Sequence, residues 1–105
     1  MIELKKDFTK NGIHYQQIFK NDELFIYRCT NETYGYKYFE VFKRRVNKAG
    51  MCHNDDWERY PNDNDFGRNW AYACPNAKSI IRTLQDYHPE YQLPMTYADL
   101  EKMCR

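Results

Sequence analysis

The chain contains few glycines and few prolines, four of each in 105 residues. It has no glycine-rich elbow around a nucleophile, no serine-centred motif and no phosphate-binding glycine loop. None of the sequence patterns that carry covalent or phosphoryl chemistry is therefore present. We predict that the protein is not an enzyme and has no catalytic residues.

Long apolar runs and paired cysteines are also missing. No segment approaches the ~20 apolar residues of a membrane-spanning helix, and the opening MIELKKDF has no apolar run behind its lysines, so no signal peptide is expected. Without an export signal, the four scattered cysteines are expected to be free thiols in a reducing cytoplasm. Cys52 and His53 are adjacent and Cys74 and His88 are distant, whereas zinc sites use pairs such as C-x2-C. We therefore expect no metal and no cofactor.

The net charge is only +1, which argues neither for nor against nucleic acid. The charges are unevenly spread, however. Residues 1–50 carry ten Lys or Arg against six Asp or Glu, whereas residues 51–75 carry two against five. This distribution predicts a basic side and an acidic loop.

Aromatic residues make up 17% of the chain, including ten tyrosines, which favours strands over a plain helical bundle. Residues 1–12 are expected to be a lead-in. Alternating apolar residues between polar turns then predict strands, at Ile13–Lys20, Leu24–Thr30, Tyr36–Val46 and Trp70–Cys74. We predict an α+β fold with a three- to four-stranded antiparallel meander, forming a single domain over residues 1–105.

The clearest periodic signal predicts a helix from Asn76 to Tyr87. Its apolar residues recur at helical spacing and form a single stripe, namely Ala77, Ile80, Ile81, Leu84 and Tyr87. Asn76 is the expected N-cap, and the helix should end before Pro89. A short C-terminal helix is expected after Thr96. The long helix needs an apolar surface, and the aromatic strands are the candidate.

Residues 47–69 lack periodicity, and a segment of this length without regular structure is usually functional or disordered. Its acids do not match a calcium loop, because Phe66 would occupy a ligand position. Asn and Asp in such a segment commonly form turns by bonding their own backbone. The acids can equally face a basic partner, and the aromatic residues can form either a contact surface or a small core under the loop. The predicted partner-binding residues are Asp55, Asp56, Trp57, Glu58, Asp63, Asp65 and Arg68.

The basic, aromatic stretch 36–48 suggests an alternative, because such residues on a sheet can stack bases and pair with phosphates. They can also be a strand whose aromatics fill the core and whose charged ends are solvated. The residues assigned to nucleic-acid binding in this alternative are Tyr36, Tyr38, Lys43, Arg44 and Arg45.

The order of the strand YFEVFKRRV, the phrase YPNDNDFGRNWAY and the helix AKSIIRTLQDY resembles small uncharacterised proteins encoded by bacteriophages and prophages. These share a basic strand of the type Y-E-V-x-[KR]-x-[KR] and a segment of the type P-x-[DN]-x-D-F-G before a helix. The likeness covers roughly residues 36–87, and Asp65, Phe66, Gly67 and Trp70 match most closely. It implies a phage or mobile-element origin and action in the cytoplasm of a host bacterial cell.

The predicted function is a non-enzymatic binding protein that acts on a host protein or ribonucleoprotein complex. The resemblance implies inhibition of a host defence system such as CRISPR. The alternative is a single-stranded nucleic-acid-binding module using the basic aromatic strand. A third hypothesis is a small hydrolase or nuclease in which the loop acids hold a metal.

Overall fold

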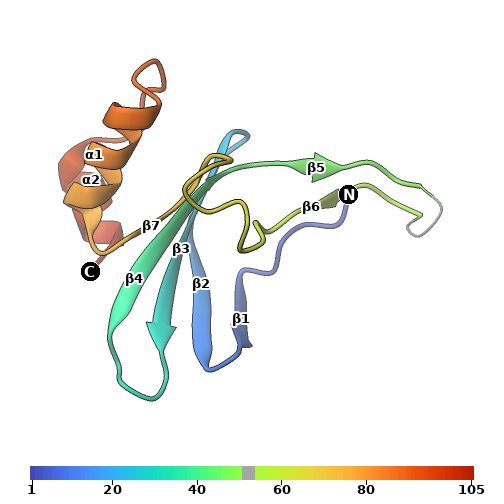
Figure 1. The fold of residues 1–105 in the computed structure, drawn as a ribbon, viewed down its shortest axis with the longest axis horizontal. Helices are drawn as coiled ribbons and strands as arrows, with labels where there is room; N and C mark the ends of the chain where they lie inside the picture. Colours follow the sequence, from blue (N-terminus) through green and yellow to red (C-terminus); the bar gives the residue numbers. More distant parts are fainter. Residues whose placement is uncertain (51–53) are drawn as a thin grey trace.

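The computed structural model describes residues 1–50 and 54–105, so the expectation concerning Cys52 and His53 lies outside the described residues. Figure 1 shows a twisted sheet with both helices at one side and a thin arm extending from the other. The elements in chain order are β1 (Asp7–Lys10), β2 (Ile13–Lys20), β3 (Leu24–Asn31), β4 (Lys37–Lys43), β5 (Val46–Asn47), β6 (Trp57–Glu58), β7 (Ala71–Cys74), α1 (Ala77–Tyr87) and α2 (Tyr97–Met103).

The main sheet has five antiparallel strands in the order β1-β2-β3-β4-β7. The α+β class is confirmed, but the predicted number of strands is too low, because the expected lead-in, residues 1–12, contains β1. Strand β1 pairs with β2 through a turn at Asn11 and Gly12, whose φ angles are 53° and 76°. Positive φ at both central residues is the geometry of tight hairpins. With only Phe8 partly buried, β1 has no alternating pattern to reveal it.

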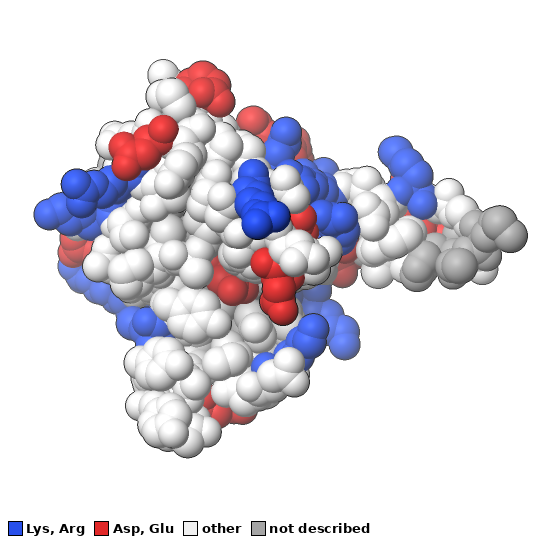
Figure 2. Space-filling view, viewed as in Figure 1, with Lys and Arg blue, Asp and Glu red and all other residues white. Residues whose placement is uncertain are grey.

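The predicted strand Tyr36–Val46 is divided in the structure. Strand β4 ends at Lys43, and β5 pairs instead with β6 in a separate two-stranded sheet. These two short strands form the base of the arm, and all but Val46 of their residues belong to the segment 47–69 that was expected to lack regular structure. The arm leaves the body of the molecule as a narrow projection (Figures 1 and 2).

One face of the sheet packs against the helices, as predicted. Ile26 and Val41 are paired across β3 and β4 and lie in the same buried cluster as Ile80 and Leu84 of α1 and Leu100 of α2. Each buried aliphatic side chain of this kind contributes roughly 1.5–3 kcal/mol relative to exposure. The expected helix stripe is thus confirmed except at its end.

The two helix starts are also as expected. The side chain of Asn76 accepts a hydrogen bond from the Ser79 N–H at 2.9 Å, and the Thr96 hydroxyl accepts one from Asp99 N–H at 3.2 Å. The last residue of the predicted stripe, Tyr87, is 66% exposed and stacks on Tyr72 of β7.

The second face of the sheet is also covered. Phe25, Tyr27 and Phe42 are fully buried there, and Tyr60 and Phe66, which belong to the segment 47–69, pack onto them. This area of the sheet is therefore not open to a partner. Tyr60 and Phe66 belong to a small core under the loop, one of the two expected alternatives.

Candidate functional site

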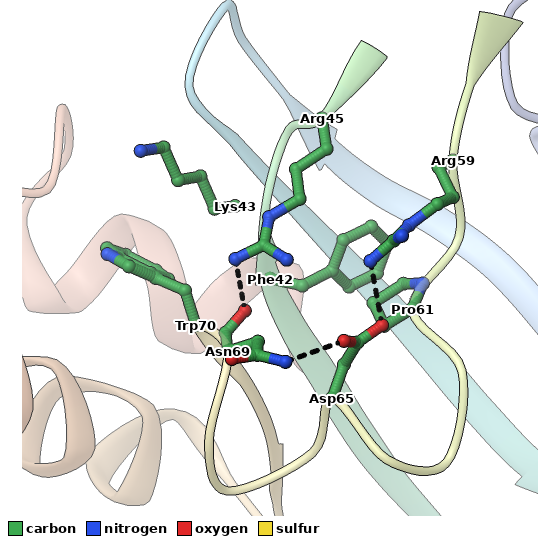
Figure 3. Close-up of a pocket in the computed structure, with 8 residues that line it drawn as sticks. All are labelled: Phe42, Lys43, Arg45, Arg59, Pro61, Asp65, Asn69 and Trp70. Atoms are coloured by element: carbon green, nitrogen blue, oxygen red, sulfur yellow. Dashed lines mark hydrogen bonds and ion pairs between the residues drawn. The ribbon is translucent and has the colours of Figure 1, made fainter. Parts of the chain in front are cut away.

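Asp65 holds the segment 59–69, which we call the cover loop, in a fixed shape. This residue is only 5% exposed. Its carboxylate accepts hydrogen bonds from Asn69 Nδ2 at 2.9 Å and from Arg59 at 2.9 Å (Figure 3). It also accepts one from the Asn62 backbone N–H at 3.0 Å. The Asn69 bond is the main reason that the pKa of Asp65 lies below its usual value. Asp65 is therefore a structural residue rather than a contact for a partner.

Glu58 has a similar internal role. Its side chain is fully buried and accepts hydrogen bonds from Arg44 Nε at 2.6 Å, from Leu4 N–H at 2.9 Å and from Lys20 Nζ. Burial alone would raise the pKa of Glu58, but these donors lower it overall. The predicted partner contact Glu58 and the predicted nucleic-acid contact Arg44 therefore form an ion pair with each other inside the domain.

The three predicted residues on the arm keep some exposure. Asp55 is exposed and pairs with the terminal ammonium of Met1 at 2.9 Å. Asp56 is half-buried and accepts a hydrogen bond from the Ala49 N–H at 2.7 Å. Trp57 is half-buried and pairs with Asn47 in the two-stranded sheet. These residues lie at the base of the arm.

Asp63 and Arg68 are the predicted residues most open to solvent on the cover loop. Both are exposed, and neither forms an ion pair within residues 1–50 and 54–105. Both lie close in sequence to Asp65, whose hydrogen bonds hold the cover loop in one shape. Asp63 and Arg68 are therefore exposed residues on an ordered loop.

The five residues of the alternative do not form a single platform. Tyr36 is 56% exposed and stacks on Tyr34 near one end of β4, whereas Lys43 and Arg45 lie at or beyond the other end. Tyr38 is half-buried in the cluster on the second face. The aromatic and cationic halves of the set are thus separated by most of the strand.

Figure 3 shows two of the predicted cations, Lys43 and Arg45. Lys43, Arg45 and Arg59 line a small recess together with Trp70, and Arg45 donates to the Asn69 carbonyl at 2.7 Å. The recess has a volume of about 10 Å³, which accommodates at most one water molecule. It is therefore a bonded network and not a ligand pocket, although its outer side is basic.

Trp70 lies in an unusual backbone conformation beside this recess. Its φ is 60°, in the left-handed region that non-glycine residues rarely adopt. The indole stacks on the His88 ring at a centroid distance of 3.9 Å, and His88 Nε2 lies 2.7 Å from the Tyr72 hydroxyl. These contacts hold the strained residue between β7 and the end of α1, where burial lowers the pKa of His88.

A larger cleft of about 410 Å³ opens under the other side of the cover loop. It was not predicted, because its walls come from separate strands whose contacts have no local sequence signal. Its lining is Phe8, Lys10, Asn11, Tyr15, Glu40, Tyr60, Pro61, Asn62, Asp63 and Phe66.

Glu40 is the main charged group inside the cleft. It is half-buried and accepts a hydrogen bond from the Tyr60 hydroxyl at 2.5 Å. Burial is the main cause that raises the pKa of Glu40 above its usual value, and the charge of Asp63 adds to the effect. Burial also raises the pKa of the neighbouring Tyr60 and Cys29 well above their usual values, so neither is activated as a nucleophile.

The described residues contain no group of three or more His, Cys, Asp or Glu side chains arranged to hold a metal ion. In the same part of the chain, neither helix has the length and apolar character needed to cross a membrane. The three cysteines in the described ranges are free and buried, as expected for Cys29, Cys74 and Cys104.

Comparison with protein-family models, with curated proteins and with solved structures finds no match to this chain. The geometry of the chain itself therefore has to support any functional conclusion.

Proposed function

We propose that this chain is a non-enzymatic binding protein of phage or mobile-element origin that acts on a host macromolecular complex. Inhibition of a bacterial defence system such as CRISPR is the specific form of this proposal. One observation supports it most: the cover loop is fixed from inside by Asp65 and Tyr60, while Asp63 and Arg68 on the same loop remain exposed.

A loop that is ordered before binding loses less conformational entropy when a partner docks. Exposed carboxylates on such a loop also steer a basic partner toward it and set the orientation of docking. The arm carries two further carboxylates next to β6, Asp55, which pairs with the Met1 ammonium, and Asp56, which pairs with Lys48. The predicted contact set is therefore reduced to Asp55, Asp56, Asp63 and Arg68, with half-buried Trp57 beside them.

The proposal is tested by charge reversal at the two exposed acids, Asp55 and Asp63. Tagged wild-type chain, Asp55→Lys, Asp63→Lys and the double variant are used to capture proteins from a host lysate. Asp22→Lys is the matched control, because Asp22 is an exposed acid in the β2–β3 turn and is not part of the cover loop. The proposal predicts a stoichiometric partner that the wild type and the control retain and the double variant loses.

A plating assay tests the defence-inhibitor form. Expression of the chain in a bacterium with active CRISPR immunity should raise the plating efficiency of a targeted phage, and the double variant should not. No partner in the capture experiment and no change in plating across several immune hosts would contradict the proposal.

A second candidate function, single-stranded nucleic-acid binding, is favoured by the grouping of Lys43, Arg45 and Arg59 beside Trp70. Cations in such a group pair with phosphates, and an indole can stack on a base. A gel-shift series with labelled single strands tests it. Binding should weaken steeply with salt and be lost in Lys43→Ala/Arg45→Ala but not in the control Lys78→Ala on α1. Absence of binding at low salt would exclude this function.

A further inference from the structure

The cleft beneath the cover loop has aromatic walls. Phe8 and Tyr15 stack on each other with ring centroids 4.7 Å apart, and the Tyr60 ring meets both edge-on at 5.9 Å and 5.8 Å. Phe66 lines the same space. The volume of about 410 Å³ is at the lower end of small-molecule pockets, which span roughly 300–1,000 Å³. The cleft therefore suits one amino-acid side chain or a small organic molecule.

The charge in this cleft is negative and uncompensated. Glu40 forms no ion pair in the described part of the chain, and its side-chain hydrogen-bond partners, the Tyr60 hydroxyl and the Cys29 thiol, are both uncharged. Asp63 adds a second carboxylate at the exposed rim. Lys10 is the only cation in the lining, and its side chain is exposed. A half-buried carboxylate without a counterion disfavours folding relative to a neutral residue.

Aromatic walls around a carboxylate recognise a particular class of ligand. Ring faces attract organic cations, and the attraction increases when the cation leaves water. A carboxylate provides the matching charge and accepts the N–H bonds of ammonium or guanidinium groups. An anionic ligand would instead meet two carboxylates, and an uncharged one would leave the charge of Glu40 uncompensated.

We propose that the cleft binds an alkylammonium or guanidinium group, with Glu40 as its counterion and Asp63 guiding entry at the rim. Such a group can come from a Lys or Arg side chain of a polypeptide or from a free small amine. The polypeptide source rests on the proposed binding function, in which a basic partner docks on the acidic cover loop. The chemistry of the cleft does not depend on that function.

The test is a titration followed by two-dimensional NMR of the backbone amides. The free cations are butylammonium and butylguanidinium, with butanol as the neutral control. The peptide probes are acetyl-Gly-Lys-Gly-amide and acetyl-Gly-Arg-Gly-amide, with the norleucine peptide as the neutral control. The expected result is a saturable shift of amides around Phe8, Tyr15 and Tyr60 with the cations, and none with the neutral probes.

Variants of Glu40 and Asp63 then test whether these carboxylates bind the cation. Glu40→Gln keeps an oxygen acceptor for Tyr60 and should weaken cation binding at least tenfold. Asp63→Lys lies at the exposed rim, where folding is little affected, and should weaken it by a similar factor. Asp22→Asn is the control and should leave binding unchanged. Retained shift dispersion establishes that each variant is folded, and Asp63→Lys decides the question if Glu40→Gln does not fold.

Each outcome has a defined meaning. Saturable binding of the peptides alone supports a polypeptide source, and binding of the free cations supports a cation site open to small amines. No saturable response to any cation, equal binding of the neutral probes, or full affinity in both Glu40→Gln and Asp63→Lys would overturn the inference. Failure here would leave the proposed function to be decided by the capture experiment, which does not require the cleft.

Discussion

Removal of the Tyr60 ring should destabilise the protein far more than removal of an exposed tyrosine. The ring lies 4.7 Å from Phe42, 5.2 Å from Tyr27, 5.8 Å from Tyr15 and 5.9 Å from Phe8, measured between centroids. Truncation of a buried aromatic residue to alanine costs about 3–5 kcal/mol. Because Tyr60 is half-buried, we expect Tyr60→Ala to cost about 3 kcal/mol, at the lower end of that range.

The hydroxyl and the ring can be separated by a second substitution. Tyr60→Phe keeps the ring but removes the hydroxyl that donates to the half-buried Glu40, which should cost about 1 kcal/mol. Urea unfolding followed by fluorescence measures both effects. For an m-value of about 1.5 kcal/mol/M, Tyr60→Ala should lower the midpoint by about 2 M.

The control is Tyr34→Ala, since Tyr34 is 79% exposed at the β3–β4 turn. A surface change of this kind should alter stability by less than about 0.5 kcal/mol. If Tyr60→Ala shifted the midpoint no more than the Tyr34 control does, the cover loop would not be packed on the sheet.

Four further predictions concern other groups in the fold. Glu58→Gln removes the counterion of two partly buried cations and should cost about 2–3 kcal/mol at neutral pH, measured by urea unfolding. Because the pKa of Glu58 is lowered by folding, its contribution is present above its unfolded pKa and is lost as pH falls toward the folded value. Glu40 has a raised pKa, so its charge opposes folding above the raised pKa, and Glu40→Gln should be neutral or stabilising at pH 7. A Glu58→Gln midpoint that matches wild type at pH 7, or a large loss for Glu40→Gln, would contradict these assignments. Asn76→Ala should cost about 1 kcal/mol through loss of the helix cap. The control Gln85→Ala, at an exposed position of α1, should leave stability nearly unchanged, and equal urea midpoints for the two variants would argue against the cap. Iodoacetamide should leave the buried thiols unmodified until denaturant is added, because burial raises their pKa; peptide-resolved mass spectrometry would detect early labelling of Cys29, Cys74 or Cys104.

Elements defined by local patterns were predictable from the sequence. The stripe and cap of α1 depend on residues within a few positions of each other, and both are present. The alternation along β4 is equally local: Phe39 and Val41 lie in one buried cluster, and Tyr38 and Phe42 lie in the other.

Features that depend on distant contacts were not predictable. The burial of Glu58 results from Lys20, Leu4 and Arg44, which come from three other parts of the chain. An acidic residue in an irregular segment has the same local pattern whether it is buried or exposed, so Glu58 and Asp63 could not be distinguished. The cleft was missed for the same reason, since its walls come from β1, β2, β4 and the cover loop.

The packing of the cover loop on the sheet is tested most directly by nuclear Overhauser effects from the Tyr60 ring. The structure predicts cross-peaks from this ring to the rings of Phe42, Tyr27 and Phe8, at centroid distances of 4.7–5.9 Å. Cross-peaks confined to the immediate sequence neighbours of Tyr60 would contradict it, and would remove both the fixed acidic loop and the cleft beneath it.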